Sequence, residues 1–517
     1  MAIKVSLLVV FFAITVGVGL YFRKRNTSVS NFVLGGRSVG PWLSAFAYGT
    51  SYFSAVVFVG YAGQFGWKFG VSSVWIGLGN AFIGSLLAWV VLGRRTRLMT
   101  RHLGSSTMPE FFGARYASKG LKIGASLITF IFLVPYTASL YNGLSRLFAM
   151  AFEVDFTICI IAMAALTCVY VIAGGYIATA ANDFIQGIIM LGGIIAVVAA
   201  VLQVNGGFVA SLDALARVND PTISETPGVL ASFFGPDPAS LLGVVLLTSI
   251  GTWGLPQMVQ KFYAIKSEKH INKGTVISTV FAVVVSGGCY FLGSFGHLFA
   301  DKVDVATEGF DAIIPAMLSG FSPLLIGIVI MLVLSASMST LSALVMTSAS
   351  TFTLDFLKGN VIKKMDEKAQ LFTIRAMIAF FVAVSAVIAI VQYKMNLAFI
   401  AQLMGVSWGA LAGSFLAPFL YGLYWKRTTK VAVWVSFGFG TLVMTANILF
   451  RSHFPALLQS PINAGAFVML AGLVLVPLVS LFTKAPGKEL VESAFSCYDR
   501  TVTVSMRESL GSENAEA

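Results

Sequence analysis

The sequence predicts an all-α membrane protein with about 13 transmembrane helices, and three observations support this fold class. Of the 517 residues, 57% are hydrophobic and only 11% are charged, whereas about a quarter of the residues of a soluble domain are charged. Long apolar runs recur along the whole chain, and a membrane-spanning helix needs about 20 such residues. The short segments between these runs hold most of the Lys and Arg. A lipid bilayer is the solvent that suits this balance.

Thirteen apolar runs are long enough to span a bilayer. They cover residues 3–22, 40–66, 70–93, 121–151, 154–173, 180–203, 240–263, 274–300, 323–355, 373–392, 396–424, 431–450 and 464–482. The first run has no basic start and no small-residue cleavage site, and it ends directly in Arg23, Lys24 and Arg25. We therefore expect a retained span at the N-terminus and not a signal peptide.

Basic residues set the expected orientation, because cytoplasmic loops carry an excess of Lys and Arg. With the N-terminus outside, the basic segments all lie inside: 23–38, 94–120, 264–273, 356–372, 425–430 and the tail 484–517. The outside segments hold isolated basic residues only. The number of spans and the distribution of charge agree, although each was obtained separately. The net charge of +12 thus indicates membrane orientation, and we expect no nucleic-acid partner.

Two spans contain signals for a broken helix. Secondary transporters bind their substrate near the middle of the membrane, at helices interrupted in matching positions of two inverted repeats. One candidate is Gly49-Thr50-Ser51, and the other is the stretch 251–257 around Pro256, which lacks a backbone donor. The candidates lie five spans apart, and an odd offset gives the two halves opposite orientations. The alternative is a pair of packing kinks, since Gly and Pro are tolerated in membrane helices.

Polar groups in two further spans are candidates for cation binding. Ala336, Ser339 and Thr340 stand at i, i+3 and i+4, so they share one face of a helix. Their carbonyl and hydroxyl oxygens would form half of a cage for sodium, a hard cation that takes oxygen ligands; alternatively, the hydroxyls bond back to their own helix. Asp183 is either a functional intramembrane carboxylate or a first-turn residue at a helix N-terminus.

These motifs resemble those of the sodium/solute symporter family, with its bacterial proline and pantothenate branches the most similar. The resemblance rests on four motifs in the family's order: Gly35 to Pro41, Thr50 to Ser54, Gly174-Gly175 leading to Asn182 to Gly187, and Ser337 to Ser342. It extends from Asn31 to about Lys430. It implies a leucine-transporter-like core of five plus five helices in inverted repeat at 40–424. One span and a cytoplasmic loop at 1–39 would precede the core, and two spans at 425–483 and the cytoplasmic tail 484–517 would follow it.

The resemblance also implies a sodium site between the first and eighth core helices. Backbone carbonyls of Thr50, Phe53 and Ala336 would bind the ion, together with the side-chain oxygens of Ser339 and Thr340.

Some members of the family hold a second sodium at the position of Asp183, paired with two adjacent serines. Here those positions are Ser342 and Ala343, so one hydroxyl is missing and we expect a single sodium. Asp183 and Ser342 stay candidates for a second cation or for coupling.

The substrate pocket of the family lies beside the first and sixth core helices. The acidic residue of the proline branch is replaced by Tyr52, and its two aromatic positions are Thr248 and Thr252, which argues against proline. The acidic residue of sugar-transporting members is absent near Ser73. The candidate pocket residues are neutral and partly aromatic, which suits a small zwitterion or monocarboxylate: Tyr52, Ser54, Tyr136, Thr252, Trp253 and Gln257.

We therefore expect a sodium-coupled symporter that imports an amino acid or small monocarboxylate by alternating access in a bacterial inner membrane. Its expected partners are the solute, the sodium ion and the lipid bilayer, with no obligate protein partner. An enzyme is not expected, because no His, Cys or carboxylate pair converges within the membrane. Two alternatives are a proton-coupled carrier of the same fold that uses Asp183, and a non-transporting membrane sensor.

Overall fold

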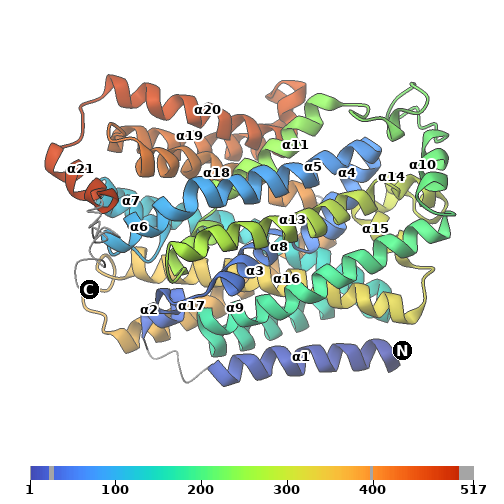
Figure 1. Ribbon diagram of the computed structural model, residues 1–517, viewed down its shortest axis with the longest axis horizontal. Coiled ribbons are helices and arrows are strands. Elements are labelled where there is room, and N and C mark those ends of the chain that lie inside the picture. Colours follow the sequence, from blue (N-terminus) through green and yellow to red (C-terminus); the bar gives the residue numbers. More distant parts are fainter. Residues whose placement is uncertain (1, 23–27, 396–399, 500–517) are drawn as a thin grey trace, which may run out of the picture.

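The computed structural model describes residues 2–22, 28–395 and 400–499. Long helices run side by side along the long axis of the molecule (Figure 1). They are α1 (Ala2–Phe22), α8 (Lys119–Phe152), α9 (Phe156–Val204), α13 (Lys269–Gly293), α16 (Pro323–Thr351), α17 (Glu367–Met395), α18 (Ile400–Tyr424), α19 (Lys430–Leu449) and α20 (Pro461–Phe482). Within the described residues the β-bridges are isolated ones. The all-α prediction is confirmed.

Shorter helices complete the bundle and its two ends. They are α2 (Val29–Leu34), α3 (Pro41–Tyr52), α4 (Ala62–Phe69), α5 (Val74–Gly79), α6 (Arg94–His102), α7 (Met108–Arg115), α10 (Phe208–Ala216), α11 (Pro238–Ile250), α12 (Pro256–Ala264), α14 (Val305–Glu308), α15 (Ile313–Leu318) and α21 (Lys488–Phe495). Wider π-helical turns occur at Val56–Tyr61, Asn80–Leu87, Trp89–Gly93 and Phe352–Leu357.

Ten helical stretches of the described chain are long and apolar enough to cross a membrane, or eleven with the bent pair α11 and α12. The expected number of thirteen stays a prediction. The 49 residues of α9 would extend about 73 Å if straight, more than twice the bilayer core. Gly175 interrupts α9 with a φ of 59°. Thr15 of α1 accepts a hydrogen bond from Asn182, and Gly19 lies against Tyr170, so both halves of α9 contact α1.

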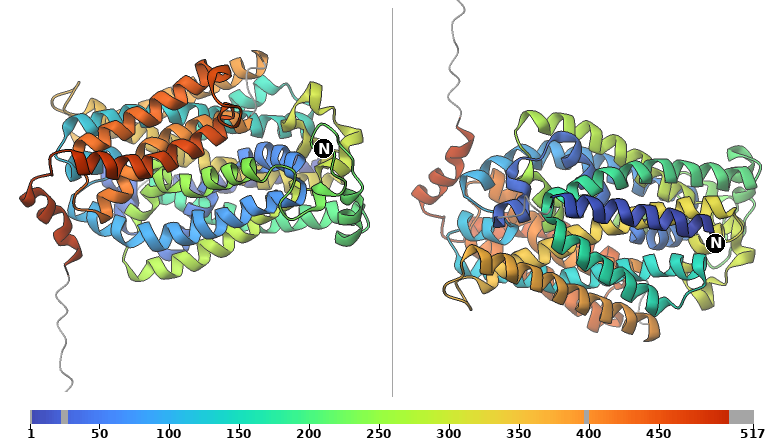
Figure 2. Two further views of the ribbon diagram at one scale, coloured as in Figure 1. Left: turned by 90° about the horizontal axis from the view of Figure 1, so that it is seen from above. Right: turned by 90° about the horizontal axis from the view of Figure 1, so that it is seen from below.

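Burial separates an inner group of helices from an outer one. In α16 every residue from Leu332 to Thr351 is buried, as is every residue of α18 from Met404 to Phe419. The outer helices expose large apolar side chains; for example, Leu442 of α19 is 70% exposed and Phe482 of α20 is 87% exposed. Such faces are costly in water and favourable against lipid. The view from below in Figure 2 shows α1 lying along the outside of the bundle.

Both predicted interruptions occur, but the first lies later than expected. The prediction placed it at Gly49-Thr50-Ser51, whereas α3 continues to Tyr52 and Phe53 is extended, with φ −108° and ψ 118°. Gly49 serves packing instead, because a Cβ there would lie 2.5 Å from the Phe281 ring. The second interruption is at the predicted place: a tight turn at 251–254 ends α11, α12 begins at Pro256, and the axis bends by 47°.

Two glycines allow α4 and α13 to touch backbone to backbone. A Cβ on Gly66 would lie 2.0 Å from the carbonyl oxygen of Gly293, and a Cβ on Gly293 would lie 2.0 Å from that of Ala62. We expect Gly66→Ala to force the helices apart and to lower the thermal stability of the purified protein, by about 1–3 kcal/mol as for other overpacked sites. Gly192→Ala, where a Cβ would meet no atom within 4 Å, is the matched control and should leave the melting temperature unchanged. Equal melting temperatures for both variants would contradict this close contact.

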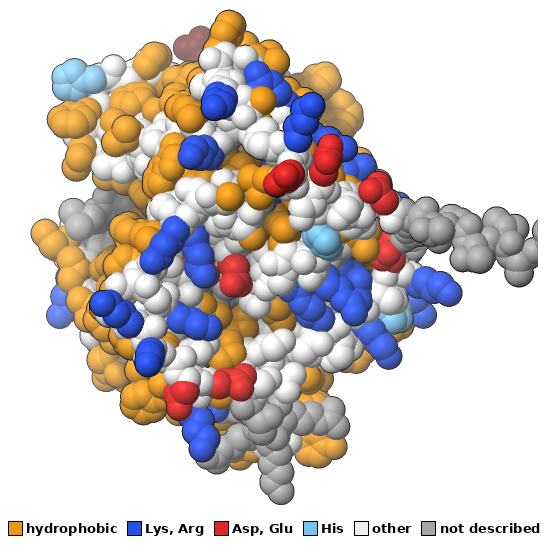
Figure 3. All heavy atoms as spheres, turned by 90° about the vertical axis from the view of Figure 1, so that its left-hand side faces the viewer, with side chains coloured by type: hydrophobic (Ala, Val, Ile, Leu, Met, Phe, Trp, Pro, Cys, Tyr) orange, Lys and Arg blue, Asp and Glu red, His pale blue; other side chains and the backbone are white. Residues whose placement is uncertain are grey.

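The basic loops gather at one end of the bundle. Figure 1 places α2, α6, α7 and α21 together there, and Figure 3 shows Lys and Arg side chains spread across that face. Arg37 donates a hydrogen bond to the carbonyl of Ser105 (2.5 Å), and Arg97 donates to that of Ile265 (2.7 Å). These hydrogen bonds join neighbouring loops at the basic end of the bundle.

The C-terminal tail is helical in its described part. Helix α21 lies beside α6, where His102 Nε2 is 2.8 Å from the carbonyl oxygen of Ser493. Tyr498 donates a hydrogen bond to the carbonyl of Arg95, whose guanidinium lies 4.6 Å from the Tyr498 ring centroid. Residues 500–517 of the predicted tail and the cluster 23–25 lie outside the described residues.

Candidate functional site

Oxygen atoms from α3 and α16 converge at the interruption of α3. The Ser339 hydroxyl lies 3.0 Å from the carbonyl oxygen of Thr50 and 3.1 Å from that of Ala336. The Thr340 hydroxyl lies 3.2 Å from the Thr50 oxygen, 3.4 Å from the Ser51 oxygen and 3.0 Å from the Ala336 oxygen. Each hydroxyl has one hydrogen. Three carbonyls and two hydroxyls therefore share two hydrogens, which leaves an excess of lone pairs in one buried place.

The separations between these hydrogen-bonded oxygens can be compared with those around a bound cation. A cation of the size of Ca²⁺ or Na⁺ lies about 2.4 Å from its oxygen ligands, so neighbouring ligands are about 3.4 Å apart. The observed separations of 3.0–3.4 Å are close to this value. The hydrogen bonds to the Ala336 carbonyl also show that both hydroxyls can bond back to their own helix, which was the alternative interpretation of these two residues. Phe53 stands directly after α3 in an extended conformation, and Ser51 was not predicted.

Buried aromatic rings lie next to the oxygen cluster. The centroid of the Trp408 ring is 6.2 Å from that of Tyr52 and 5.9 Å from that of Tyr136, which meets it edge-on. The Tyr136 hydroxyl and the Trp408 indole nitrogen form no hydrogen bond within the described residues. Tyr52 donates to the carbonyl of Thr248 (2.5 Å), and Ser54 accepts from the amide of Val56 (3.2 Å). The Tyr136 hydroxyl faces Ser54 and the Trp408 indole, so these polar groups lie together beside the rings.

The sequence did not point to Trp408. The local sequence gives only a weak indication that Trp408 belongs to a site, because Trp408 is a single large ring between Gly405 and Gly409 in the fully buried part of α18. In a span that is buried on all sides, no periodicity marks one face as special.

Of the three predicted residues after α11, two have their polar groups engaged in hydrogen bonds. Thr252 donates to the carbonyl of Ser249 (2.9 Å) or Gly84 (3.2 Å), and Trp253 donates to that of Ile83 (3.1 Å). Both therefore face the π-helical turn 80–87, a kind of turn that is frequent at functional sites. Gln257 is buried, and its Oε1 has no partner within the described residues.

Asp183 lies eight residues after the interruption of α9 at Gly175, which is beyond the first turn of the second half of this helix. The helix N-terminus interpretation of Asp183 is therefore wrong. Its carboxylate Oδ2 is 3.8 Å from Lys261 Nζ, and the two side chains are 1% and 5% exposed. Lys261 also lies 5.4 Å from the centroid of the Tyr176 ring. Ser342, predicted to assist Asp183, donates instead to the carbonyl of Ser339 (2.8 Å).

The sequence analysis did not identify Lys261 as a site residue, although a Lys inside an apolar span indicates that an acidic partner is buried nearby. Its partner Asp183 belongs to another span, and nothing in the local sequence of either residue identifies the other.

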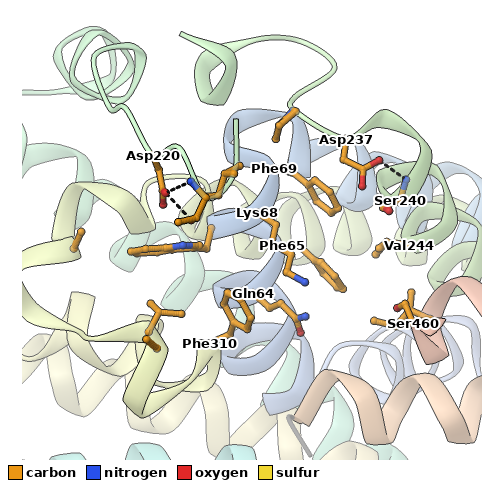
Figure 4. Close-up of a pocket in the computed structure, with 18 of the residues that line it drawn as sticks. Gln64, Phe65, Lys68, Phe69, Asp220, Asp237, Ser240, Val244, Phe310 and Ser460 are labelled. Atoms are coloured by element: carbon orange, nitrogen blue, oxygen red, sulfur yellow. Dashed lines mark hydrogen bonds between the residues drawn. The ribbon is translucent and has the colours of Figure 1, made fainter. Parts of the chain in front are cut away.

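A cavity of about 740 Å³ opens at the end of the bundle opposite the basic loops. Figure 4 shows Lys68 at its centre, with Gln64 beside it and Asp220 and Asp237 nearer the rim. Gln64 belongs to the same interrupted span as Tyr52. The cavity thus reaches one half of the broken helix.

Comparisons with known proteins identify the family of this chain. The model of the sodium:solute symporter family matches residues 32–438. An osmoregulated proline transporter of Bacillus subtilis (strain 168) is 28% identical over 505 residues, which cover 94% of this chain and 96% of the relative. A sodium/proline symporter of Staphylococcus aureus is 29% identical over 497 residues, which cover 93% of each protein.

Solved structures share the fold. A sodium-coupled sialic acid symporter in a substrate-bound, outward-open state superposes with a TM-score of 0.74 at 15% identity, over 94% of this chain and 99% of that chain. A nucleobase-cation-symport-1 family transporter in a closed conformation has a TM-score of 0.51 at 14% identity, over 91% of this chain and 99% of that one. The expected leucine-transporter-like fold is confirmed. The family match over most of its length shows that this chain belongs to the sodium:solute symporter family: it is a membrane transporter that couples a solute to sodium, and not an enzyme.

Proposed function

We propose that this transporter imports a small apolar amino acid, with proline as the first candidate, together with one sodium ion. The observation that carries the proposal is the buried oxygen cluster of Thr50, Ala336, Ser339 and Thr340 beside the aromatic rings of Tyr52, Tyr136 and Trp408. The names of the Bacillus subtilis and Staphylococcus aureus relatives add support for proline.

In this proposal sodium binds where α3 is interrupted. The carbonyls of Thr50, Phe53 and Ala336 and the hydroxyls of Ser339 and Thr340 are its ligands. The ion neutralises the excess of lone pairs and ties α3 to α16. Binding of the ion organises the adjacent pocket, a coupling worth about 1–3 kcal/mol.

The solute occupies the aromatic pocket next to the ion. The flat faces of Tyr52 and Trp408 suit a small aliphatic ring, and the Tyr136 hydroxyl supplies a polar contact. Ser54, Thr252, Trp253 and Gln257 stay candidates for the pocket wall. The replacement of the acidic residue by Tyr52 does not exclude proline, since free carbonyls of an interrupted helix can receive the solute's ammonium group and free amides its carboxylate.

Transport proceeds by alternating access between the two ends of the bundle. With the basic end in the cytoplasm, the N-terminus is outside, the C-terminus is inside, and the 740 Å³ cavity opens outward. Entry of one sodium supplies about 2.3 kcal/mol per 100 mV and about 1.4 kcal/mol for each tenfold gradient. This suffices to concentrate a neutral solute by two to three orders of magnitude. The inverted repeats span 40–424, the membrane is a bacterial inner membrane, and no protein partner is required.

The test is a thermal-shift screen of the purified protein with amino acids, short monocarboxylates, pantothenate and sugars, each in sodium and in choline. We expect proline or a close analogue to raise the melting temperature in sodium only. Equal stabilisation in both salts would reject coupled binding. A proton-coupled carrier that uses Asp183 would instead take up solute along a pH gradient without sodium; the counter-charge of Lys261 at 3.8 Å favours the sodium-coupled form.

Tyr136→Phe tests the solute pocket. Removal of the hydroxyl should cost one hydrogen bond of about 0.5–1.5 kcal/mol, so the half-saturating solute concentration for uptake should rise roughly 2- to 12-fold. The half-saturating sodium concentration should stay the same. The matched control is Tyr141→Phe, because Tyr141 lies on the same helix with an equally buried and unbonded hydroxyl. A solute affinity that changes equally in both variants would show that Tyr136 acts through packing.

A further inference from the structure

We infer that Asp183 and Lys261 form a built-in cation site: the Lys261 ammonium fills the position that a second metal cation would take at Asp183, and the pair thereby limits coupling to one sodium. The inference rests on the proposed function, because it assumes that the one sodium binds at the α3–α16 oxygen cluster. The transport cycle proposed above assigns no role to the buried carboxylate of Asp183.

The charge of Asp183 requires a positive partner. Its side chain is 1% exposed in the buried interior of a membrane protein, where an isolated carboxylate is expensive. Among the described residues, Lys261 is the one basic group in ion-pair range. Both carboxylate oxygens lack a hydrogen bond within the described chain. The ammonium at 3.8 Å therefore neutralises the carboxylate without being hydrogen-bonded to it, as a cation in a loose site would.

The pair lies next to the proposed sodium site, on its basic side. Gly187 follows Asp183 by one helical turn, and a Cβ on Gly187 would lie 3.1 Å from the Thr50 side chain. Asp183 is thus about one turn, or 6 Å, further along α9 toward the basic end. Lys261 reaches it from α12, the half-helix that begins at Pro256. The ion pair therefore joins the half-helix α12 to α9 on the side of the oxygen cluster that faces the basic end.

Other oxygens at this place would complete a metal site if Lys261 were absent. Gln186 stands three residues after Asp183, on the same face of α9, and its Oε1 is buried without a partner in the described chain. Ser342 of α16 lies beside Tyr170, which is itself close to Asp183, whereas the neighbouring Ala343 has no hydroxyl. Two carboxylate oxygens, one amide oxygen and one hydroxyl are hard ligands that suit sodium. The fixed ammonium takes the place of that ion.

The test compares wild type with Lys261→Met, which keeps the length of the side chain and removes its charge. We measure the sodium dependence of solute uptake and of the melting temperature, with potassium as the control cation. We expect a Hill coefficient of about 1 in wild type and one that approaches 2 in the variant, because a second sodium then binds at Asp183. The double variant Asp183→Asn, Lys261→Met is the matched control and should return to about 1, since it has neither charge.

Each outcome decides the inference. If Lys261→Met is unstable in low salt, high sodium and not potassium should restore its melting temperature; failure of sodium to do so overturns the inference. A Hill coefficient that stays at one in a folded Lys261→Met protein overturns it as well, and leaves the proposed function intact. Wild-type uptake that does not depend on sodium would overturn the proposed function itself, which the same experiment reports separately.

Discussion

The double substitution Ser339→Ala, Thr340→Ala is expected to abolish sodium-driven uptake at physiological sodium while the protein still folds. Each hydroxyl contacts carbonyls of both α3 and α16. Loss of a polar contact to a charged group costs about 1.5–3 kcal/mol, so each single variant should raise the half-saturating sodium concentration by roughly 10- to 150-fold. The measurement is solute uptake into proteoliposomes as a function of sodium concentration.

Ser337→Ala is the matched control for this prediction. Ser337 lies on the same helix, two residues before Ser339. It is fully buried and has no hydrogen-bond partner in the described chain. Its removal should leave the sodium dependence as in wild type. An unchanged half-saturating sodium concentration in both Ser339→Ala and Thr340→Ala would reject the proposed sodium site. Melting temperatures in choline close to that of wild type would show that neither variant is merely unfolded.

Asp355→Ala is expected to cause the largest loss of stability. The Asp355 carboxylate is completely buried at the basic end of the α16 span, where Thr107 donates a hydrogen bond to it (2.5 Å) and Lys122 Nζ lies 3.2 Å away. Removal of one partner of a buried pair typically costs about 3–5 kcal/mol. Lys122 is 26% exposed, so water can solvate it after the substitution, and we expect the lower part of that range. The measurement is thermal unfolding of the purified protein.

Two comparisons make the Asp355 prediction specific. Asp355→Asn keeps an acceptor for Thr107 and should lose less stability than Asp355→Ala. Asp213→Ala removes an exposed carboxylate on α10 and should change stability by no more than about 0.5 kcal/mol. If Asp355→Ala melts within a degree or two of the Asp213→Ala protein, the ion pair and the Thr107 bond do not anchor α16 to α7 and α8.

A feature of this structure can be predicted from the sequence when residues that are neighbours along the chain specify it. The apolar run that becomes α1, the break before Pro256 and the shared face of Ser339 and Thr340 all follow from neighbouring residues, through the length of a bilayer span, the missing amide of proline and the 3.6-residue helical repeat. These features agree with the structure, and the family motifs agree with the comparisons.

The remaining features depend on which helices touch and how each is rotated about its axis. The interruption of α3 lies at Phe53 and not at Gly49, whose missing Cβ instead makes room for the Phe281 ring. Nothing in the sequence around Trp408 or Lys261 marks them as special, since their partners belong to distant spans. The sequence by itself therefore determined the membrane class, the kinds of helix and one face of the proposed ion site. Only the tertiary structure decided which buried charges and rings meet, because side-chain partners hundreds of residues apart are selected by helix packing and not by local pattern.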